Sequence, residues 1–567
     1  MTTSTEALTH AAERPAGGSL PPMLPGRLPF LGHLLALRRD PIGLMQRVHR
    51  ACGTAGTIDL AGHRLVLFFG ARAQETFFRA PDEQLDQAAA YPFMKPIFGP
   101  GVVFDATPEQ RKQAMRNQSL RDRYMRGHAE TIAAEVERMI SGWGPSGTFD
   151  ALDFFSELTL YTSTSALVGR SFREEIGPDF VPIFKDLERG TDALAYVNPY
   201  LPLPAFWRRD RARRALVARL GAIFARRERE GDHPGDLFDV LRRLRDDAGR
   251  PRYTDDQITG MFISMMFAGH HTSSVVGSWA LLDLLLHPEW LARVREELDT
   301  LYADGRDVSY QALREIPLLE ACLKETLRLH PPLILLLRVV ARDFGCEGYR
   351  IPVGTTVGVS PAVSNRMPEH FPEPERYDPS RYEPGREEDK QPFAWIPFGA
   401  GRHRCVGAAF AMMQLKAIFS ILLRRYDFEL AQPPESYAND HSKMVVAVRQ
   451  PCRIRFRERA APRSRVAVRA GTGDAAAPTR PCRVVVDLDL CQGHGVCVNE
   501  APEVFALDED ALQVRLLVEE PAAHQRPGVD SAVRHCPTGA LRVVEEAERG
   551  AAPPGNAPGA APREPGA

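Results

Sequence analysis

The stretch FGAGRHRCVG, residues 398–407, places Cys405 in a glycine-rich loop that also carries basic side chains. The residues that follow, AAFAMMQLKAIFSILLRR, are apolar and strongly helical, whereas the loop suits neither helix nor strand. We therefore expect Cys405 at the N-terminus of a helix, where backbone N–H groups and the helix dipole favour a thiolate over a thiol. Such a thiolate is predicted to be either a nucleophile or a metal ligand.

A long helix is predicted to begin at Thr254, because Thr254 and Gln257 form a capping box. The helical pattern continues to His287, so the helix is about 50 Å long and must cross the core. In its middle lies AGHHT, residues 268–272. Its glycine lowers the stability of a helix, and its imidazoles and hydroxyl cost free energy when they are buried without hydrogen bonds. These residues are either satisfied buried polar groups, with Thr272 bonded back to the helix, or part of a functional site.

Two further segments predict a buried ionic network. In KETLRLHPP, residues 324–332, Glu325 and Arg328 share one face of a helix. Arg381 follows a proline-bounded turn in FPEPERYDPSRY, residues 371–382, and completes a Glu–Arg–Arg set. A Glu-x-x-Arg pair taken alone is more often a surface pair.

Taken together, these motifs resemble those of the cytochrome P450 family. The resemblance implies a mainly α cytochrome P450 fold with small β-sheets, and haem b held by Cys405 as the axial thiolate. Glu325, Arg328 and Arg381 match the family's structural triad beneath the haem. Residues 268–272 match the kink of its long central helix on the oxygen side. An electron-rich sulfur ligand also suits O–O cleavage.

Within that family the sequence resembles the sterol 14α-demethylases of bacterial type. The similar segments are YPFMKPIFGPGVVFDA (91–106), MFAGHHTSS (266–274) and AQPPESYANDHSKMVV (431–446). His271 stands where most P450s carry an acid, and His403 replaces the more usual Arg of the haem loop. Both departures from the wider family agree with this subfamily.

The resemblance implies a reaction on the 14α-methyl group of a sterol. Three successive O₂-dependent oxidations would give an alcohol, an aldehyde and finally formate, leaving a 14,15 double bond. His271 and Thr272 are expected to be the catalytic proton path, because imidazole exchanges protons near neutrality. The residues expected around the haem are Gln87, Tyr91, Lys112, Arg338, His403 and Cys405. The sterol cavity is expected to be lined by Phe93, Met94, Phe98, Phe267, Ala268, Leu333 and Ile334.

The C-terminal part of the chain carries a second cysteine motif. The nine cysteines of the chain are too few and odd in number for a disulfide framework. Cys491, Cys497 and Cys536 form a C-x₂-H-x₂-C…C-P pattern in which His494 takes the place of a cysteine. Three thiolates suit a [3Fe–4S] cluster, in a small α+β domain that resembles the ferredoxins serving bacterial P450s. A [4Fe–4S] cluster with His494 as a ligand and a zinc site are the alternatives.

Composition divides the chain into five segments. We expect a flexible leader (1–24), a P450 domain (25–456), an Ala/Arg/Pro linker (457–481), a ferredoxin domain (482–548) and a disordered tail (549–567). The ferredoxin segment holds thirteen acidic residues against five arginines, whereas residues 453–480 hold eight arginines against two acids. This asymmetry either solvates the two segments or docks the small domain on a partner.

The remaining expectations concern partners and location. No apolar run is long enough to span a membrane, and the polar N-terminus does not resemble a secretory signal, so we expect a cytoplasmic protein. No flavin or nicotinamide motif is present, which predicts a separate NAD(P)H-dependent ferredoxin reductase. No nucleic-acid partner is expected. The alternative functions are hydroxylation of another steroid or terpenoid, and a haem-based redox or gas-sensing module.

Overall fold

The computed structural model describes residues 20–107, 122–177, 180–188, 190–191, 195, 198–246, 248–460, 482–508, 513–536 and 538–545. Contacts divide the chain into two compact units. Unit 1 comprises nearly all described residues from 20 to 460, and unit 2 comprises those from 482 to 545. Among the described residues, no helix is both long and apolar enough to cross a membrane.

Unit 1 is mainly helical, as expected. Its first half contains α1 (Leu34–Arg39), α2 (Pro41–Cys52), α3 (Ala71–Arg79), α4 (Lys95–Phe98), α6 (Asp122–Ile140), α7 (Ala151–Ser163), α8 (Arg170–Glu175), α9 (Phe180–Glu188), α11 (Pro204–Glu230) and α12 (Leu237–Arg243). Its second half contains α13 (Asp255–Met266), α14 (Thr272–Leu286), α15 (Pro288–Leu301), α16 (Pro317–Leu329), α17 (Pro361–Ser364) and α18 (Ala408–Arg425).

Single helical turns join several of these elements. The 3₁₀ turns are η1 (Ala88–Ala90), η2 (Pro92–Met94), η3 (Val103–Asp105), η7 (Ala312–Arg314), η8 (Pro379–Tyr382), η9 (Glu388–Lys390), η10 (Gly401–His403) and η11 (Pro434–Ser436). Two turns are π-helical, η5 (Thr164–Val168) and η6 (Phe267–His271).

The β-structure of unit 1 is confined to small sheets. A five-stranded sheet has the order β1 (Ala55–Leu60), β2 (His63–Phe68), β8 (Thr356–Val359), β5 (Leu336–Val340) and β3 (Leu85–Asp86), in which only β2 and β8 pair in parallel. A three-stranded sheet has the order β4 (Ser146–Asp150), β12 (Arg453–Glu458) and β9 (Tyr426–Leu430). Two-stranded ribbons are formed by β6 (Phe344–Cys346) with β7 (Tyr349–Ile351) and by β10 (Asn439–Asp440) with β11 (Ala447–Val448).

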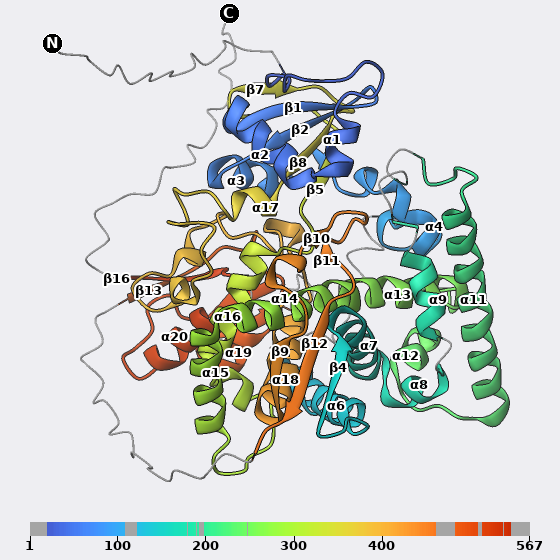
Figure 1. Ribbon diagram of the computed structural model, residues 1–567, viewed down its shortest axis with the longest axis vertical. Helices are drawn as coiled ribbons and strands as arrows, with labels where there is room; N and C mark the ends of the chain where they lie inside the picture. Colours follow the sequence, from blue (N-terminus) through green and yellow to red (C-terminus); the bar gives the residue numbers. More distant parts are fainter. Residues whose placement is uncertain are drawn as a thin grey trace, which may run out of the picture. The chain divides into compact units, whose positions relative to one another are not determined.

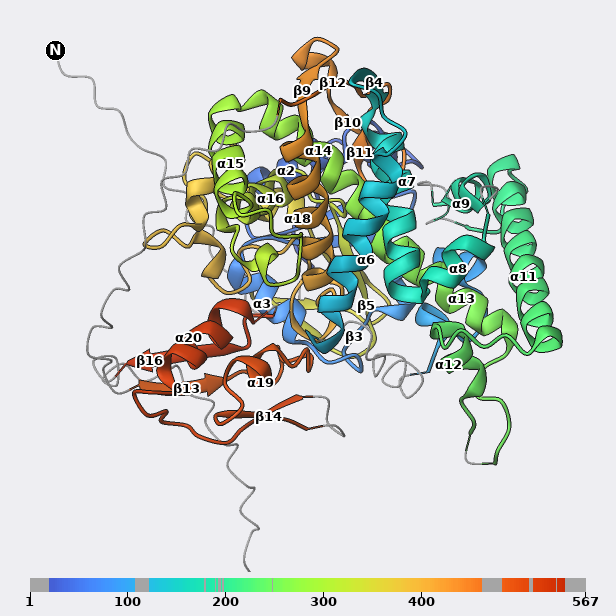
Figure 2. The ribbon, with the colours of Figure 1, turned by 90° about the horizontal axis from the view of Figure 1, so that it is seen from below.

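The predicted long helix crosses unit 1 as α13, η6 and α14, which lie in line in Figure 1. Thr254 and Gln257 form the predicted capping box at its start. Twelve of the fifteen residues of α14 are buried, because the helix packs between α7 and α16 in the largest apolar cluster. α6, α16 and α18 contribute to the same cluster, and Figure 2 shows α18 between α16 and α6.

Unit 2 is a small α+β unit. It contains β13 (Cys482–Val486) paired with β16 (Leu541–Glu545), β14 (Phe505–Asp508) paired with β15 (Gln513–Leu516), and helices α19 (Val496–Glu500) and α20 (Arg526–His535). The two helices pack side by side, as Figure 2 shows, over a core that includes Val504, Phe505 and Val529.

The observed structure departs from two expected segment ends. Residue Leu24 is buried, and Met23 forms a bridge to Thr57, so residues 20–24 belong to the folded unit and not to a flexible leader. Strand β12 runs to Glu458 and takes the first two residues of the expected linker. The rest of the expected linker beyond residue 460, residues 1–19 and the expected tail lie outside the described residues.

Candidate active site

The cysteine loop has the shape that its glycines predict. Gly399 and Gly401 adopt positive φ angles of 65° and 61°. A Cβ at Gly401 would overlap the carbonyl oxygen of Phe78, so only glycine fits there. The loop closes where the N–H of Cys405 donates to the carbonyl of Phe398 at 2.9 Å, and α18 begins after its N-cap, Gly407.

The expected low pKa of the Cys405 thiol is wrong for the protein alone. Burial raises the pKa of this thiol more than the Gly407 N–H and the Arg404 charge lower it. The side chain is nevertheless exposed, although protein surrounds it. An accessible sulfur whose thiolate form lacks stabilisation suits a metal cation, because coordination deprotonates a thiol outright.

Arg338 on β5 is a buried cation that forms no ion pair with the described residues. It is 3% exposed, and its Nε and Nη1 have no hydrogen-bond partner in the described part of the chain. Its guanidinium lies over the ring of Phe77, 5.2 Å from the centroid. Burial lowers the pKa of Arg338, although the charges of Tyr91, Asp82 and Asp86 oppose this. Such a group fits a carboxylate ligand.

The other predicted haem contacts vary in their surroundings. The Tyr91 hydroxyl accepts the N–H of Leu337 at 3.0 Å, and burial raises the pKa of this phenol. His403 directs Nε2 to Oδ1 of Asp82 at 2.5 Å. Gln87 is half-buried at the start of η1. Lys112 lies outside the described residues.

The middle of the long helix is a π-helical turn, η6, a feature often found at functional sites. The Thr272 hydroxyl donates to the carbonyl of Ala268 at 2.8 Å, which is the predicted back-bonding. Ala268 is exposed although its helix crosses the core, so it faces an opening in unit 1. Gly269 is closely approached, because a Cβ there would lie 3.2 Å from Oγ of Ser163.

Two adjacent histidines of this turn share one carboxylate. Oε1 of Glu188, the last residue of α9, lies 3.3 Å from Nε2 of His270 and 3.8 Å from Nδ1 of His271. All three side chains are buried, and Nδ1 of His270 lies 3.0 Å from the Thr159 hydroxyl. The sequence analysis did not identify Glu188.

Burial and the neighbouring charges oppose each other in the pKa of Glu188 and in the pKa of His271, and both pKa values are lowered. Burial alone would raise the pKa of Glu188, but the neighbouring His271 and His270 lower it to about 2. Burial lowers the pKa of His271, and the Glu188 carboxylate partly opposes that fall. Glu188 is therefore ionised at neutral pH, and its charge raises the pKa of His271 against the larger fall that burial causes.

The predicted Glu–Arg–Arg network is present and fully buried. Arg328 donates from Nε and Nη2 to the two carboxylate oxygens of Glu325, both at 2.8 Å. Arg381 donates from Nε to Oε1 of Glu325 at 3.1 Å, and the Tyr382 hydroxyl donates to Oε2 at 2.9 Å. Both arginines also bind backbone carbonyls between residues 365 and 376, so the network fixes this irregular segment.

The expected cavity residues fall into two groups. Phe93, Met94, Phe98 and Phe267 belong to one apolar cluster, in which the rings of Phe98 and Phe267 meet edge to face 5.8 Å apart. Leu333 and Ile334 instead pack against two other clusters. Met444, which the sequence analysis did not single out, packs against the first cluster as well as the main core.

Three cysteines of unit 2 lie close enough for their charges to interact. Cys491, Cys497 and Cys536 are half-buried against the small core. Burial and then the neighbouring thiolates raise the pKa of Cys497 to about 12. The N–H of Val514 donates to Sγ of Cys491, and Gly493 and Gly495 adopt positive φ angles. Cys482 is buried on β13, away from this motif in sequence.

Across the described ranges, no three His, Cys, Asp or Glu side chains are close enough to hold a single metal ion. The cysteines of an iron–sulfur cluster bind different irons, so they need not surround one point.

A profile of the family described as Cytochrome P450 matches residues 21–456, most of the chain. The chain belongs to the cytochrome P450 family. A profile described as 4Fe-4S single cluster domain matches residues 484–543. This second match indicates an iron–sulfur cluster in unit 2.

The chain matches relatives in the P450 family over nearly the whole length of those relatives. The chain is 57% identical over 432 residues to the sterol 14alpha-demethylase of Mycobacterium tuberculosis, covering 76% of this chain and 96% of that protein. It is 37% identical over 459 residues to the obtusifoliol 14-alpha demethylase of Sorghum bicolor, covering 79% and 92%. The structure of retinoic acid-bound cyanobacterial CYP120A1 superposes with a TM-score of 0.69 at 24% identity, covering 78% of this chain and all of that one, which supports the fold.

The P450 site of this chain fits haem. The accessible sulfur of Cys405, in its glycine loop, suits the iron. The buried guanidinium of Arg338, whose Nε and Nη1 have no partner among the described residues, suits a propionate. Cys405 would hold the iron, and Arg338 with Tyr91 would meet the carboxylates. Cys491, Cys497 and Cys536 of unit 2 are near enough for their charges to interact, which fits the binding of an iron–sulfur cluster.

Proposed function

We propose that the protein is a sterol 14α-demethylase whose electrons pass through its own iron–sulfur unit. The observation that carries this proposal is 57% identity over 96% of the length of the mycobacterial sterol 14alpha-demethylase. The substrate would be a sterol, and O₂ the co-substrate. Haem with a thiolate ligand supplies O₂ activation and O–O cleavage when bound.

The apolar cluster of Phe93, Met94, Phe98 and Phe267 would hold the sterol rings and exclude water. These side chains are buried and offer no hydrogen bond, so they suit a rigid hydrocarbon skeleton. Ala268 is small and exposed, which leaves room beside the helix for the methyl group that is oxidised.

His271 would supply protons and Thr272 would pass them on. Glu188 is ionised and holds both imidazoles from one carboxylate, so it orients His271 and supports its protonated form. The Thr272 hydroxyl donates a hydrogen bond to the Ala268 carbonyl. When it receives a proton from His271, it can donate its own proton to another acceptor. Each of the three oxidations consumes protons, so this path would be used three times.

The cluster of unit 2 would pass single electrons to the P450. Three cysteines with His494 in the second place of the motif favour a [3Fe–4S] cluster over a [4Fe–4S] cluster. Because the chain carries no flavin or nicotinamide motif, a separate NAD(P)H-dependent ferredoxin reductase would reduce the cluster. Tethering to unit 1 would raise the effective concentration of the electron donor to the millimolar range.

The proposal is tested by turnover of a 14α-methyl sterol with NADPH and an added ferredoxin reductase. We expect formate and the 14,15-unsaturated sterol in equal amounts. An alcohol as the only product would indicate plain hydroxylation instead. Turnover with NADPH but without added reductase would contradict the predicted partner.

A further inference from the structure

The N-terminal end of unit 1 exposes an unusual number of large apolar side chains. Phe30 is 97% exposed, and three leucines beside it in sequence, Leu28, Leu31 and Leu35, are between 40% and 52% exposed. Four of the twelve large apolar side chains that the described residues expose therefore come from eight consecutive positions. Exposed apolar side chains scattered singly are ordinary, whereas a gathered set marks an interaction surface.

Phe30 is also held in a strained backbone conformation. Its φ angle is 59°, in the left-handed region that bulky residues rarely adopt. The neighbouring chain fixes this turn, because Leu28 and Gly32 exchange backbone hydrogen bonds at 2.9 Å. The fold therefore directs a phenyl ring into solvent at a conformational cost, which a purely structural role does not explain.

Arginines surround this apolar segment. Residues 20–64 contain six arginines and two acids, Asp40 and Asp59. Asp40 caps α2 by accepting the N–H of Gly43, and Asp59 accepts the N–H of Gly62 and lies 3.9 Å from Arg27. Arg47, Arg50 and Arg64 are exposed and form no ion pair with any described residue. The segment is thus both apolar and cationic.

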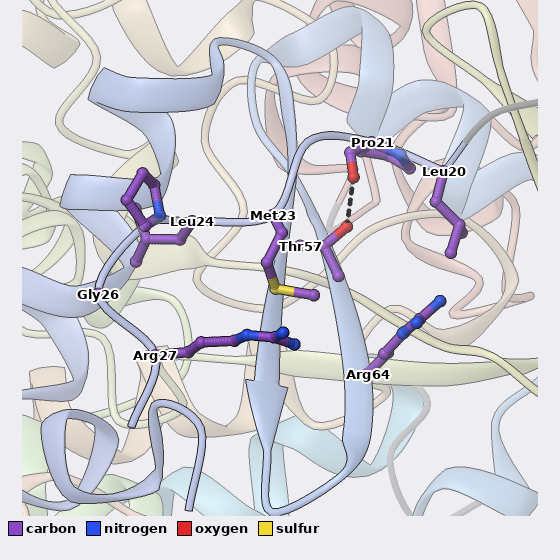
Figure 3. Close-up of a pocket in the computed structure, with 9 residues that line it drawn as sticks. Leu20, Pro21, Met23, Leu24, Gly26, Arg27, Thr57 and Arg64 are labelled. Carbon is purple, nitrogen blue, oxygen red and sulfur yellow. Dashed lines mark hydrogen bonds between the residues drawn. The ribbon is translucent and has the colours of Figure 1, made fainter. Parts of the chain in front are cut away.

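Two recesses lie beside these arginines. One, of about 560 Å³, is lined by Met23, Leu24, Arg27 and Arg64, and the Thr57 hydroxyl donates to the Pro21 carbonyl at its wall (Figure 3). The other shares Leu24 with the first and is lined by Leu28, Arg47 and Arg50. Each recess therefore presents two guanidinium groups beside apolar side chains.

We propose that this end of unit 1, residues 20–64, docks on the surface of an anionic lipid bilayer. The exposed side chains of Leu28, Phe30, Leu31 and Leu35 would enter the headgroup and acyl boundary, and the arginines would contact lipid phosphates. Charge complementarity selects this occupant, since an apolar surface with a net charge of this sign matches an anionic interface. The test measures vesicle binding and not turnover, so the proposal stands or fails independently of the sterol reaction.

The test is co-sedimentation of the full-length holoprotein with phosphatidylcholine vesicles that contain phosphatidylglycerol. We expect binding to these vesicles that weakens with added salt, and much weaker binding to phosphatidylcholine alone. Arg47→Gln with Arg64→Gln should reduce the partition coefficient roughly thirtyfold, since each basic residue near such a surface contributes about fivefold. Arg229→Gln with Arg457→Gln removes two exposed arginines elsewhere in unit 1, neither of which pairs with an acid among the described residues, and should leave binding unchanged.

A second pair of variants tests the apolar contribution. Phe30→Asn with Leu35→Gln should reduce binding at least tenfold, and asparagine tolerates the left-handed backbone at position 30. The matched control, Val240→Gln with Leu286→Gln, changes two exposed apolar residues of helices α12 and α14. Unchanged thermal unfolding of each variant shows that folding is intact.

Three results would overturn the proposal. They are equal binding to both kinds of vesicle, equal losses in the test and control pairs, and loss of binding when residues 2–18 alone are deleted. The last result would place the membrane contact on residues 2–18 and not on residues 20–64.

Discussion

The carboxylate of Glu188 lies 3.8 Å from Nδ1 of His271, although 83 positions separate the two residues in the chain. Both are buried, and the carboxylate is ionised because its pKa falls to about 2. The Glu188 charge raises the pKa of a histidine that burial lowers more strongly, so the carboxylate shifts upward the pH at which His271 loses its proton.

Glu188→Gln should therefore lower the pKa of His271 further. The limb on which turnover declines with rising pH should move to lower pH, because the protonated imidazole is lost sooner. At neutral pH we expect about a tenfold loss of turnover, less than general acid–base catalysis contributes in full, because His271 remains in place. The measurement is the pH profile of formate release together with peroxide formed per NADPH consumed. Glu135→Gln, which changes a buried carboxylate paired with Arg173, should leave the profile unmoved.

Glu325→Gln should destabilise the protein severely. The change leaves Arg328 and Arg381 buried without their counter-charge, and breaking a buried pair in this way costs about 3–5 kcal/mol. Tyr382→Phe removes only the hydroxyl that donates to Glu325 and should cost about 1 kcal/mol. Urea unfolding followed by circular dichroism ranks the two variants. Similar losses in both would mean that the ionic network contributes little.

Gly401→Ala should disrupt the cysteine loop. The new Cβ would meet the carbonyl oxygen of Phe78, and position 401 has a positive φ angle. We expect protein with less than one haem per chain and an altered spectrum of the reduced, CO-bound state. Gly407→Ala is the matched control, because φ there is −88° and the nearest atom, Sγ of Cys405, lies at an ordinary 3.8 Å. Full haem content in Gly401→Ala would show that the loop can shift.

Arg338→Met should change the stability of the apoprotein and the retention of haem in opposite directions. Without an anion, the buried guanidinium has unpartnered N–H groups, so its removal should stabilise the apoprotein by about 1–3 kcal/mol. With haem bound, the loss of a carboxylate partner should speed haem transfer to apomyoglobin by about tenfold. Arg338→Lys keeps the charge and should retain haem better than Arg338→Met. Faster transfer without a more stable apoprotein would contradict the account of an uncompensated charge.

His494→Cys should complete a four-cysteine set in unit 2. If the native cluster is [3Fe–4S], the variant should assemble [4Fe–4S], since the fourth iron gains a thiolate ligand. Electron paramagnetic resonance distinguishes the two, because the oxidised three-iron cluster is paramagnetic and the oxidised four-iron cluster of ferredoxin type is not. An unchanged signal in the variant would show that position 494 does not face the cluster. Cys482→Ser, outside the motif, should leave the signal intact.

Much of the fold followed from local sequence patterns. The capping box at Thr254, the helix after Cys405 and the buried Glu325 network are present where the patterns predicted them. Such features depend on residues a few positions apart or on a motif with fixed spacing. The P450 fold and the separate iron–sulfur unit are likewise confirmed.

Other features depend on contacts that spacing does not reveal. Glu188 carried no motif, although Phe180, Phe184, Leu187 and Glu188 follow a helical period and so predict that the acid lies on a buried face. The direction of the Cys405 pKa was wrong because the helix-terminus argument ignored burial. Leu333 and Ile334 joined other apolar clusters because the order of residues does not determine which cluster a side chain enters.

The π-helical turn η6 amounts to one residue inserted into an otherwise α-helical rod. A chain shortened by one position there, for instance by omitting Gly269, would restore uniform winding while both flanking segments kept their buried faces. The side chains inside the turn, which include both imidazoles, would then leave the rod at other angles around its axis. The inserted residue therefore helps to set the direction in which His270 and His271 face Glu188.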